Sequence, residues 1–77
     1  MVKEEFLHLK RLLSSNVRRL RKEKGIAQER LGLEAGVDRT LISKIERELA
    51  NPSLEVLTKV AVFLGVEIKD LFKEPKK

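Results

Sequence analysis

Residues 28–47 read QERLGLEAGVDRTLISKIER, and this stretch decides the fold. Its apolar residues recur at helical spacing on both sides of Gly36, which predicts two short helices joined by a tight turn. Helices that cross at a steep angle need a small residue at the crossing, and Gly32 supplies it. The turn needs a residue that tolerates a positive φ angle, and Gly36 supplies that. The expected buried contacts are Leu31, Ala35, Val37, Ile42 and Ile45.

The second helix of this pair has an outward face that suits DNA. We expect the helix to start at Asp38, a good N-cap, and to run to about Arg47. Arginine and lysine can donate to guanine, and threonine offers a hydroxyl and a methyl group that can meet thymine. Gln28 and Arg47 flank the helix and are candidates to hold the DNA backbone. The competing interpretation, a helix pair that never touches DNA, is disfavoured by this face: Arg39, Thr40, Ser43 and Lys44.

The rest of the chain also predicts helices. A first helix ends at Gly25; it begins at Ser14 or Ser15, or runs unbroken from about Lys3, and the sequence leaves both starts open. A later helix starts at Ser53 and ends at Gly65. A short last helix is expected over about residues 67–73.

Charge and composition narrow the class of partner. The chain has 77 residues, no cysteine, one histidine, a net charge of +5 and a pI near 9.8. Seven of the basic residues lie between residues 10 and 24 beside a single acid. Such a patch attracts a polyanion, although charge alone leaves a solvated helix face, a membrane surface or an acidic protein equally open.

Several function classes are excluded. With no cysteine and only His8 as histidine, we expect no metal site and no cofactor. No paired carboxylates, nucleophile–base pair or phosphate loop is evident, so an enzyme is not expected. No apolar run approaches the length that crosses a bilayer, and no signal peptide is evident, so we expect a cytoplasmic protein that does not bind membranes.

The segment from Val17 to Phe72 resembles the phage-repressor and Cro type of helix-turn-helix domain, also called the Xre family. The strings that carry the resemblance are VRRLRKEKG, AGVDRTLISKIERE, NPSLEVLTKVAVFLGV and a final DLF. Within the family, DRTLISKIER followed by NPSLEVL is similar to controller proteins of restriction–modification systems. The resemblance implies an all-α, compact five-helix domain of the lambda-repressor-like type over residues 14–73. Residues 1–13 would then form an N-terminal helical extension, and residues 74–77 a disordered tail.

The resemblance also implies a function and roles for single residues. The chain would be a sequence-specific transcriptional regulator, with its recognition helix in the major groove of a pseudo-palindromic operator and with control of its own operon. Arg21 and Glu46 would form a structural ion pair. No small-molecule ligand is expected. The implied base contacts are Arg39, Thr40, Lys44 and Ser43, and the implied phosphate contacts are Gln28, Arg47 and Asn51.

Two positions depart from the family pattern. Ala27 stands where relatives usually carry a capping serine or threonine. Glu48 replaces the glycine that usually follows the recognition helix, which puts the geometry of the next loop in doubt.

The last two helices carry two apolar stripes. Either both serve one core, or one of them joins two subunits; we favour a homodimer. The expected interface residues are Val56, Val60, Phe63, Ile68, Leu71 and Phe72. The alternative function is an antitoxin-like or bridging module whose main partner is a protein.

Overall fold

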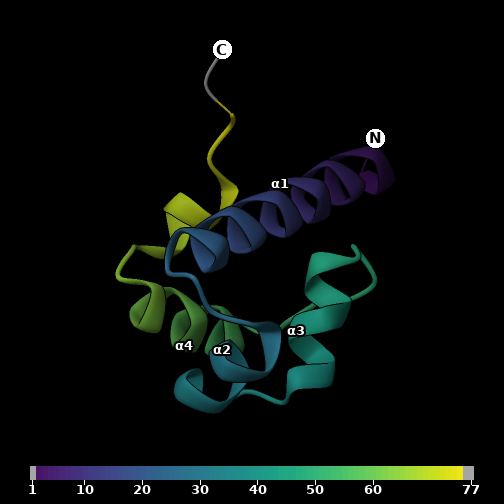
Figure 1. Ribbon diagram of the computed structural model, residues 1–77. Coiled ribbons are helices and arrows are strands. Elements are labelled where there is room, and N and C mark those ends of the chain that lie inside the picture. Colours follow the sequence, from purple (N-terminus) through teal and green to yellow (C-terminus); the bar gives the residue numbers. More distant parts are fainter. Residues whose placement is uncertain (1, 76–77) are drawn as a thin grey trace.

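The computed structural model describes residues 2–75 and is built only of helices within that range (Figure 1). The elements in chain order are α1 (Val2–Glu23), α2 (Gln28–Ala35), α3 (Arg39–Glu46), α4 (Leu54–Leu64) and the 3₁₀-helix η1 (Ile68–Phe72). The predicted all-α fold is confirmed, but the prediction of a fifth α-helix over about residues 67–73 is wrong. Its five residues form a single 3₁₀ segment, in which the N–H of Asp70 donates to the carbonyl of Glu67 at 2.9 Å. Such short segments commonly take this tighter winding.

Helix α1 is one uninterrupted helix from Val2 to Glu23, so of the two starts left open by the sequence the longer one is correct. It lies across the other helices, and its N-terminal part extends past them (Figure 1). The 13/14 boundary predicted from the family therefore falls inside a helix. Phe6 and Leu9, in the extending part, line an apolar groove with Pro52 and Phe72.

The core lies where all five elements meet. Its most deeply buried members are Val17, Leu31, Ile42, Ile45, Val60 and Leu71. Two predicted interface residues are therefore corrected: Val60 and Leu71 are 1% and 0% exposed in the single chain and have no surface left for a second subunit. The apolar period of α4 and η1 shows which residues share a stripe, but it does not show which stripe faces the chain's own core. The other four, Val56, Phe63, Ile68 and Phe72, are half-buried.

The crossing of α2 and α3 depends on Gly32. A Cβ atom added there would lie 2.5 Å from the carbonyl oxygen of Val37 and 3.2 Å from Cα of Arg39. Helix α3 then begins as predicted at Asp38, whose carboxylate accepts from the N–H of Thr40 at 2.7 Å. The two helices are thus held backbone against backbone.

All four α-helices end in the same way, with a residue at positive φ. At three ends this residue is a glycine, but after α3 it is Glu48, with φ 64°. The next N–H then donates to the carbonyl five residues back; Leu49 donates to Lys44 at 2.8 Å. The loop after α3 therefore keeps the left-handed backbone that glycine favours, although the residue is a glutamate.

Buried Asn16 anchors the end of η1 and the residue that follows it. Its amide donates to the carbonyls of Leu71 at 3.0 Å and Lys73 at 2.9 Å. His8 Nε2 lies 2.8 Å from Glu74 Oε2, so this segment runs beside α1. Of the predicted tail, residues 74 and 75 have no helix, and residues 76 and 77 lie outside the described part of the chain.

Candidate nucleic-acid interface

Helix α3 has one face in the core and one in solvent. Ile42 and Ile45 are 0% and 2% exposed, which turns the opposite face of the helix outward. That outward face carries the predicted base contacts: Arg39, Thr40 and Lys44 are exposed, and Ser43 is half-buried. Arg47, the C-cap of α3, and Asn51, in the loop that follows, are exposed as well.

Arg39 lies beside an acid of the neighbouring helix. Its Nη1 is 3.5 Å from Oε2 of Glu29, in the first turn of α2. The sequence prediction did not include Glu29 in the site.

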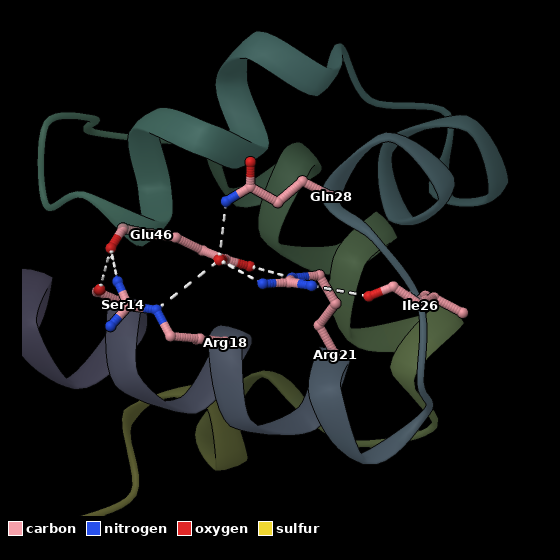
Figure 2. Close-up of polar contacts among 6 residues, drawn as sticks. All are labelled: Ser14, Arg18, Arg21, Ile26, Gln28 and Glu46. Carbon is pink, nitrogen blue, oxygen red and sulfur yellow. Dashed lines mark hydrogen bonds and ion pairs between the residues drawn. The ribbon is translucent and has the colours of Figure 1, made fainter.

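Buried Glu46, the last residue of α3, receives several donors from the rest of the chain (Figure 2). Arg21 of α1 donates through Nε to Oε2 at 2.7 Å and through Nη2 to Oε1 at 3.0 Å. Arg21 Nη1 also donates to the carbonyl of Ile26 at 2.7 Å. The structure thus contains the ion pair expected between Arg21 and Glu46, and the pair joins α1 to the end of α3.

Gln28 belongs to this same cluster. Its Nε2 donates to Oε1 of Glu46 at 3.0 Å, so the side chain of this predicted phosphate contact is turned towards α3 (Figure 2). Ala27, the N-cap of α2, makes no side-chain capping bond. The N–H groups that open α2 are therefore not capped by that residue, and a helix N-terminus of this kind suits a phosphate oxygen.

The main-chain carbonyl of Glu46 is a second point of attachment. Ser14 Oγ donates to it at 2.6 Å, and Arg18 Nη2 donates to it as well. The sequence prediction missed both residues. The signal was present, because Ser14, Arg18 and Arg21 recur at the i, i+4, i+7 spacing of one helix face. Only the position of α3 shows what that polar stripe contacts.

The pKa shifts of Glu46 and Arg21 both favour the charged forms of these side chains. Burial by itself raises the pKa of Glu46, but the hydrogen bonds from Arg21 and Gln28, with the charges of Arg21 and Arg18, outweigh it and hold that pKa below its ordinary value. The hydrogen bond to Glu46 raises the pKa of Arg21. Both groups are therefore ionised near neutral pH.

Most of the cations that form the predicted basic patch have partners within the chain. Arg18 and Arg21 contact Glu46, and Arg19 pairs with Glu23 at 3.2 Å. Lys10 and Lys24 lie over the rings of Phe6 and Phe63, at 5.1 and 5.3 Å. The patch is thus partly structural.

A family model described as helix-turn-helix matches residues 17–71, which contain α2, the turn at Gly36 and α3. The chain belongs to the helix-turn-helix family. Within this helix-turn-helix chain, α3 stands in the place of the recognition helix.

Proteins of similar sequence are named as transcription factors or control proteins. A protein named "Neisseria hypothetical transcription factor", from Neisseria meningitidis, is 38% identical over 68 residues, covering 88% of this chain and 64% of that protein. Control protein C.BamHI of Bacillus amyloliquefaciens is 40% identical over 65 residues, covering 83% and 80%. The chain spans between 38% and 64% of the length of the first three curated relatives that it matches.

A solved structure shows the same fold. The N-terminal DNA-binding domain of SinR from Bacillus subtilis superposes with a TM-score of 0.80 at 35% identity, covering 87% of this helix-turn-helix chain and 99% of that domain. Across residues 2–75 there is no group of three or more side chains suited to a metal ion. Over the same range, no helix combines the length and the apolar character needed to cross a membrane.

Proposed function

We propose that this chain is a sequence-specific DNA-binding transcriptional regulator that places α3 in the major groove of its operator. One observation carries the proposal: α3 turns Arg39, Thr40 and Lys44 to solvent while its other face is buried. A rigid helix with an exposed polar face can enter the major groove and donate to base edges. The similarity to proteins named as transcriptional regulators, among them SinR, supports the same function.

Base contacts and phosphate contacts fall on different elements in this proposal. Arg39, Thr40, Ser43 and Lys44 read bases, because they share the outward face of α3. The other set positions the protein on the DNA backbone: Gln28, Arg47 and Asn51. For Gln28 the support is its place at the uncapped start of α2, since its side chain is bonded to Glu46.

The test compares one residue from each set. Arg39→Ala is expected to cost about 1–3 kcal/mol of binding free energy on the cognate operator and to relax preference at one base pair. Arg47→Ala is the control, and it should weaken binding to all sequences alike and reduce the salt dependence. The operator is first selected from a random DNA pool at fixed salt. Unchanged selectivity of Arg39→Ala would show that the base assignment is wrong.

We further propose that the regulator binds as a homodimer. A two-fold axis would set two recognition helices about 34 Å apart, which matches half-sites one DNA turn apart. The half-buried apolar residues Val56, Phe63, Ile68 and Phe72 support an interface on α4 and η1.

Sedimentation of the DNA-free protein, well above its operator-binding concentration, tests the dimer. Ile68→Glu should dissociate it, while Leu7→Glu should not, because Leu7 is an exposed residue of α1 outside the groove that Phe72 lines. A monomer at every concentration would contradict the dimer, and the reverse result for the two variants would move the interface to α1.

The regulator is proposed to act in the cytoplasm and to control its own operon. The similarity to control protein C.BamHI supports a controller of a restriction–modification system as the narrower class. A reporter fused to the chain's own promoter should respond to added protein, and a reporter that ignores it would refute self-control.

The second candidate is a protein-interaction module. It would co-purify with a protein partner and show no DNA selectivity, whereas the regulator would show salt-sensitive binding to selected promoter fragments.

A further inference from the structure

We propose that Glu29, which faces Arg39 from α2, is a positioning residue for base recognition: it sets the direction in which Arg39 enters the groove. This inference rests on the proposed function, because it requires Arg39 to read a base. The contact joins the first turns of α2 and α3, with Glu29 Oε2 at 3.5 Å from Arg39 Nη1.

The backbone geometry explains why these two side chains meet. Glu29 and Gly32 are three residues apart on α2 and therefore share a face of that helix. The main chain of Arg39 packs against Gly32 so closely that an added Cβ would lie 3.2 Å from its N and Cα atoms. Since the main chain of Arg39 is fixed beside α2, its side chain runs next to Glu29.

Two consecutive residues of α2 thus contact the two ends of the recognition helix. Gln28 donates to Glu46 at the C-terminal end, and Glu29 pairs with Arg39 at the N-terminal end. The first turn of α2 thereby restrains both the placement of α3 and one of its proposed base-reading side chains.

The role of this pair is orientation and not stability. The side chains of Arg39 and Glu29 are 68% and 73% exposed, and ion pairs this exposed contribute little to folding. The 3.5 Å contact involves Nη1, and a guanidinium carries five N–H donors on three nitrogens, so donors remain for the edge of a guanine. A free arginine would have to lose its rotamer freedom on binding, and a partner in place beforehand reduces that loss.

A carboxylate at this surface also repels phosphates, so the test has to separate repulsion from positioning. Selectivity is measured by selection from a random DNA pool at two salt concentrations. The proteins compared are the parent chain, Glu29→Gln, Arg39→Ala and the double variant. Glu34→Gln is the matched control, since it removes the same charge from α2 at a residue that pairs with Arg30 instead.

Positioning predicts that Glu29→Gln lowers discrimination at the base pair that Arg39→Ala relaxes, by about 2- to 5-fold, the range of an exposed ion pair. The double variant should then be no less selective at that base pair than Arg39→Ala alone, and Glu34→Gln should keep the original preference.

Tighter binding of Glu29→Gln to all sequences, with a steeper salt dependence and an unchanged preference, would overturn the inference alone and leave Arg39 as a base reader. Unchanged preference in Arg39→Ala would overturn the base assignment itself, and the role of Glu29 with it.

Discussion

Arg21 and Glu46 form a two-pronged ion pair between α1 and the end of α3, with N–O distances of 2.7 and 3.0 Å. Their side chains are 12% and 1% exposed. A pair removed from water in this way costs desolvation on forming, so removing Arg21 leaves a buried carboxylate with only the Gln28 hydrogen bond and the more distant Arg18 charge to compensate it. The same pair fixes the C-terminal end of the proposed recognition helix.

Arg21→Met is therefore expected to lower the free energy of unfolding by about 3–5 kcal/mol, because Glu46 would lose its main partner inside the fold. Arg19→Met is the matched control on the same helix. Arg19 pairs with Glu23 at the surface, where both side chains are about half exposed, and such a pair contributes about 0–1 kcal/mol. Urea denaturation measures both variants. Equal losses would contradict the structural role of Arg21.

The free energy of unfolding should also depend on pH through Glu46. Its pKa in the folded chain lies below the ordinary value of 4.5, so folding favours the ionised form. The resulting stabilisation is fully present above the ordinary pKa and is lost as pH falls through the lowered one. The chain should therefore lose stability below about pH 4.5, on top of the contribution of other acids.

Glu46→Gln isolates this effect. The difference in unfolding free energy between the parent chain and the variant should be largest near neutral pH and should narrow below pH 4.5. Denaturant melts at a series of pH values measure it, and a constant difference would contradict the assignment.

The features that could be predicted from the sequence are those that depend on few neighbours. The end of α2 follows from Gly36, and the start of α3 from Asp38, since a cap or a turn involves only adjacent backbone. The pair of Arg21 and Glu46 came from the family pattern and not from spacing.

Other features require the packed structure. Whether Val60 faces the core or a partner depends on the placement of α2 and η1 against α4, which periodicity does not give. The contact of Ser14 with the Glu46 carbonyl is likewise between main-chain and side-chain atoms 32 residues apart. The start of α1 could not be predicted either, because it depends on packing in the middle of the helix, where residues between Leu12 and Val17 are buried. That packing supports the exposed N-terminal turns.

Glu48→Gly should stabilise the chain. Glu48 holds φ 64°, where an L side chain costs about 1–2 kcal/mol, and glycine gives back part of that gain through its freer unfolded state. We expect a net gain of about 0.5–1 kcal/mol in thermal or urea unfolding. Glu48→Ala controls for the lost charge, because it lacks the charge but keeps the strain, and it should gain less. Glu48→Asn should also stabilise the chain, since asparagine tolerates this backbone better than glutamate. A gain as large in Glu48→Ala would assign the effect to charge.

Ala27→Ser should stabilise α2. Ala27 has the extended backbone of an N-cap, φ −81° and ψ 165°, but makes no capping hydrogen bond. A serine hydroxyl at this position can accept from an N–H of the first turn, which is worth about 1 kcal/mol. Ala27→Val keeps the position apolar and should bring no gain. If serine and valine behave alike in urea unfolding, the cap is not formed.

Gly32→Ala should damage both folding and DNA binding, because the added Cβ would meet a backbone oxygen at 2.5 Å and α3 would have to move away from α2. Overpacking of this kind costs about 1–3 kcal/mol. Gly36→Ala is the control: its φ of 73° makes alanine strained, but the added Cβ has no atom within 4 Å, so α3 can keep its place. At temperatures where both variants are folded, Gly32→Ala should bind the operator more weakly and Gly36→Ala should bind it normally. Normal binding by Gly32→Ala would mean that the spacing between α2 and α3 does not set the position of the recognition helix.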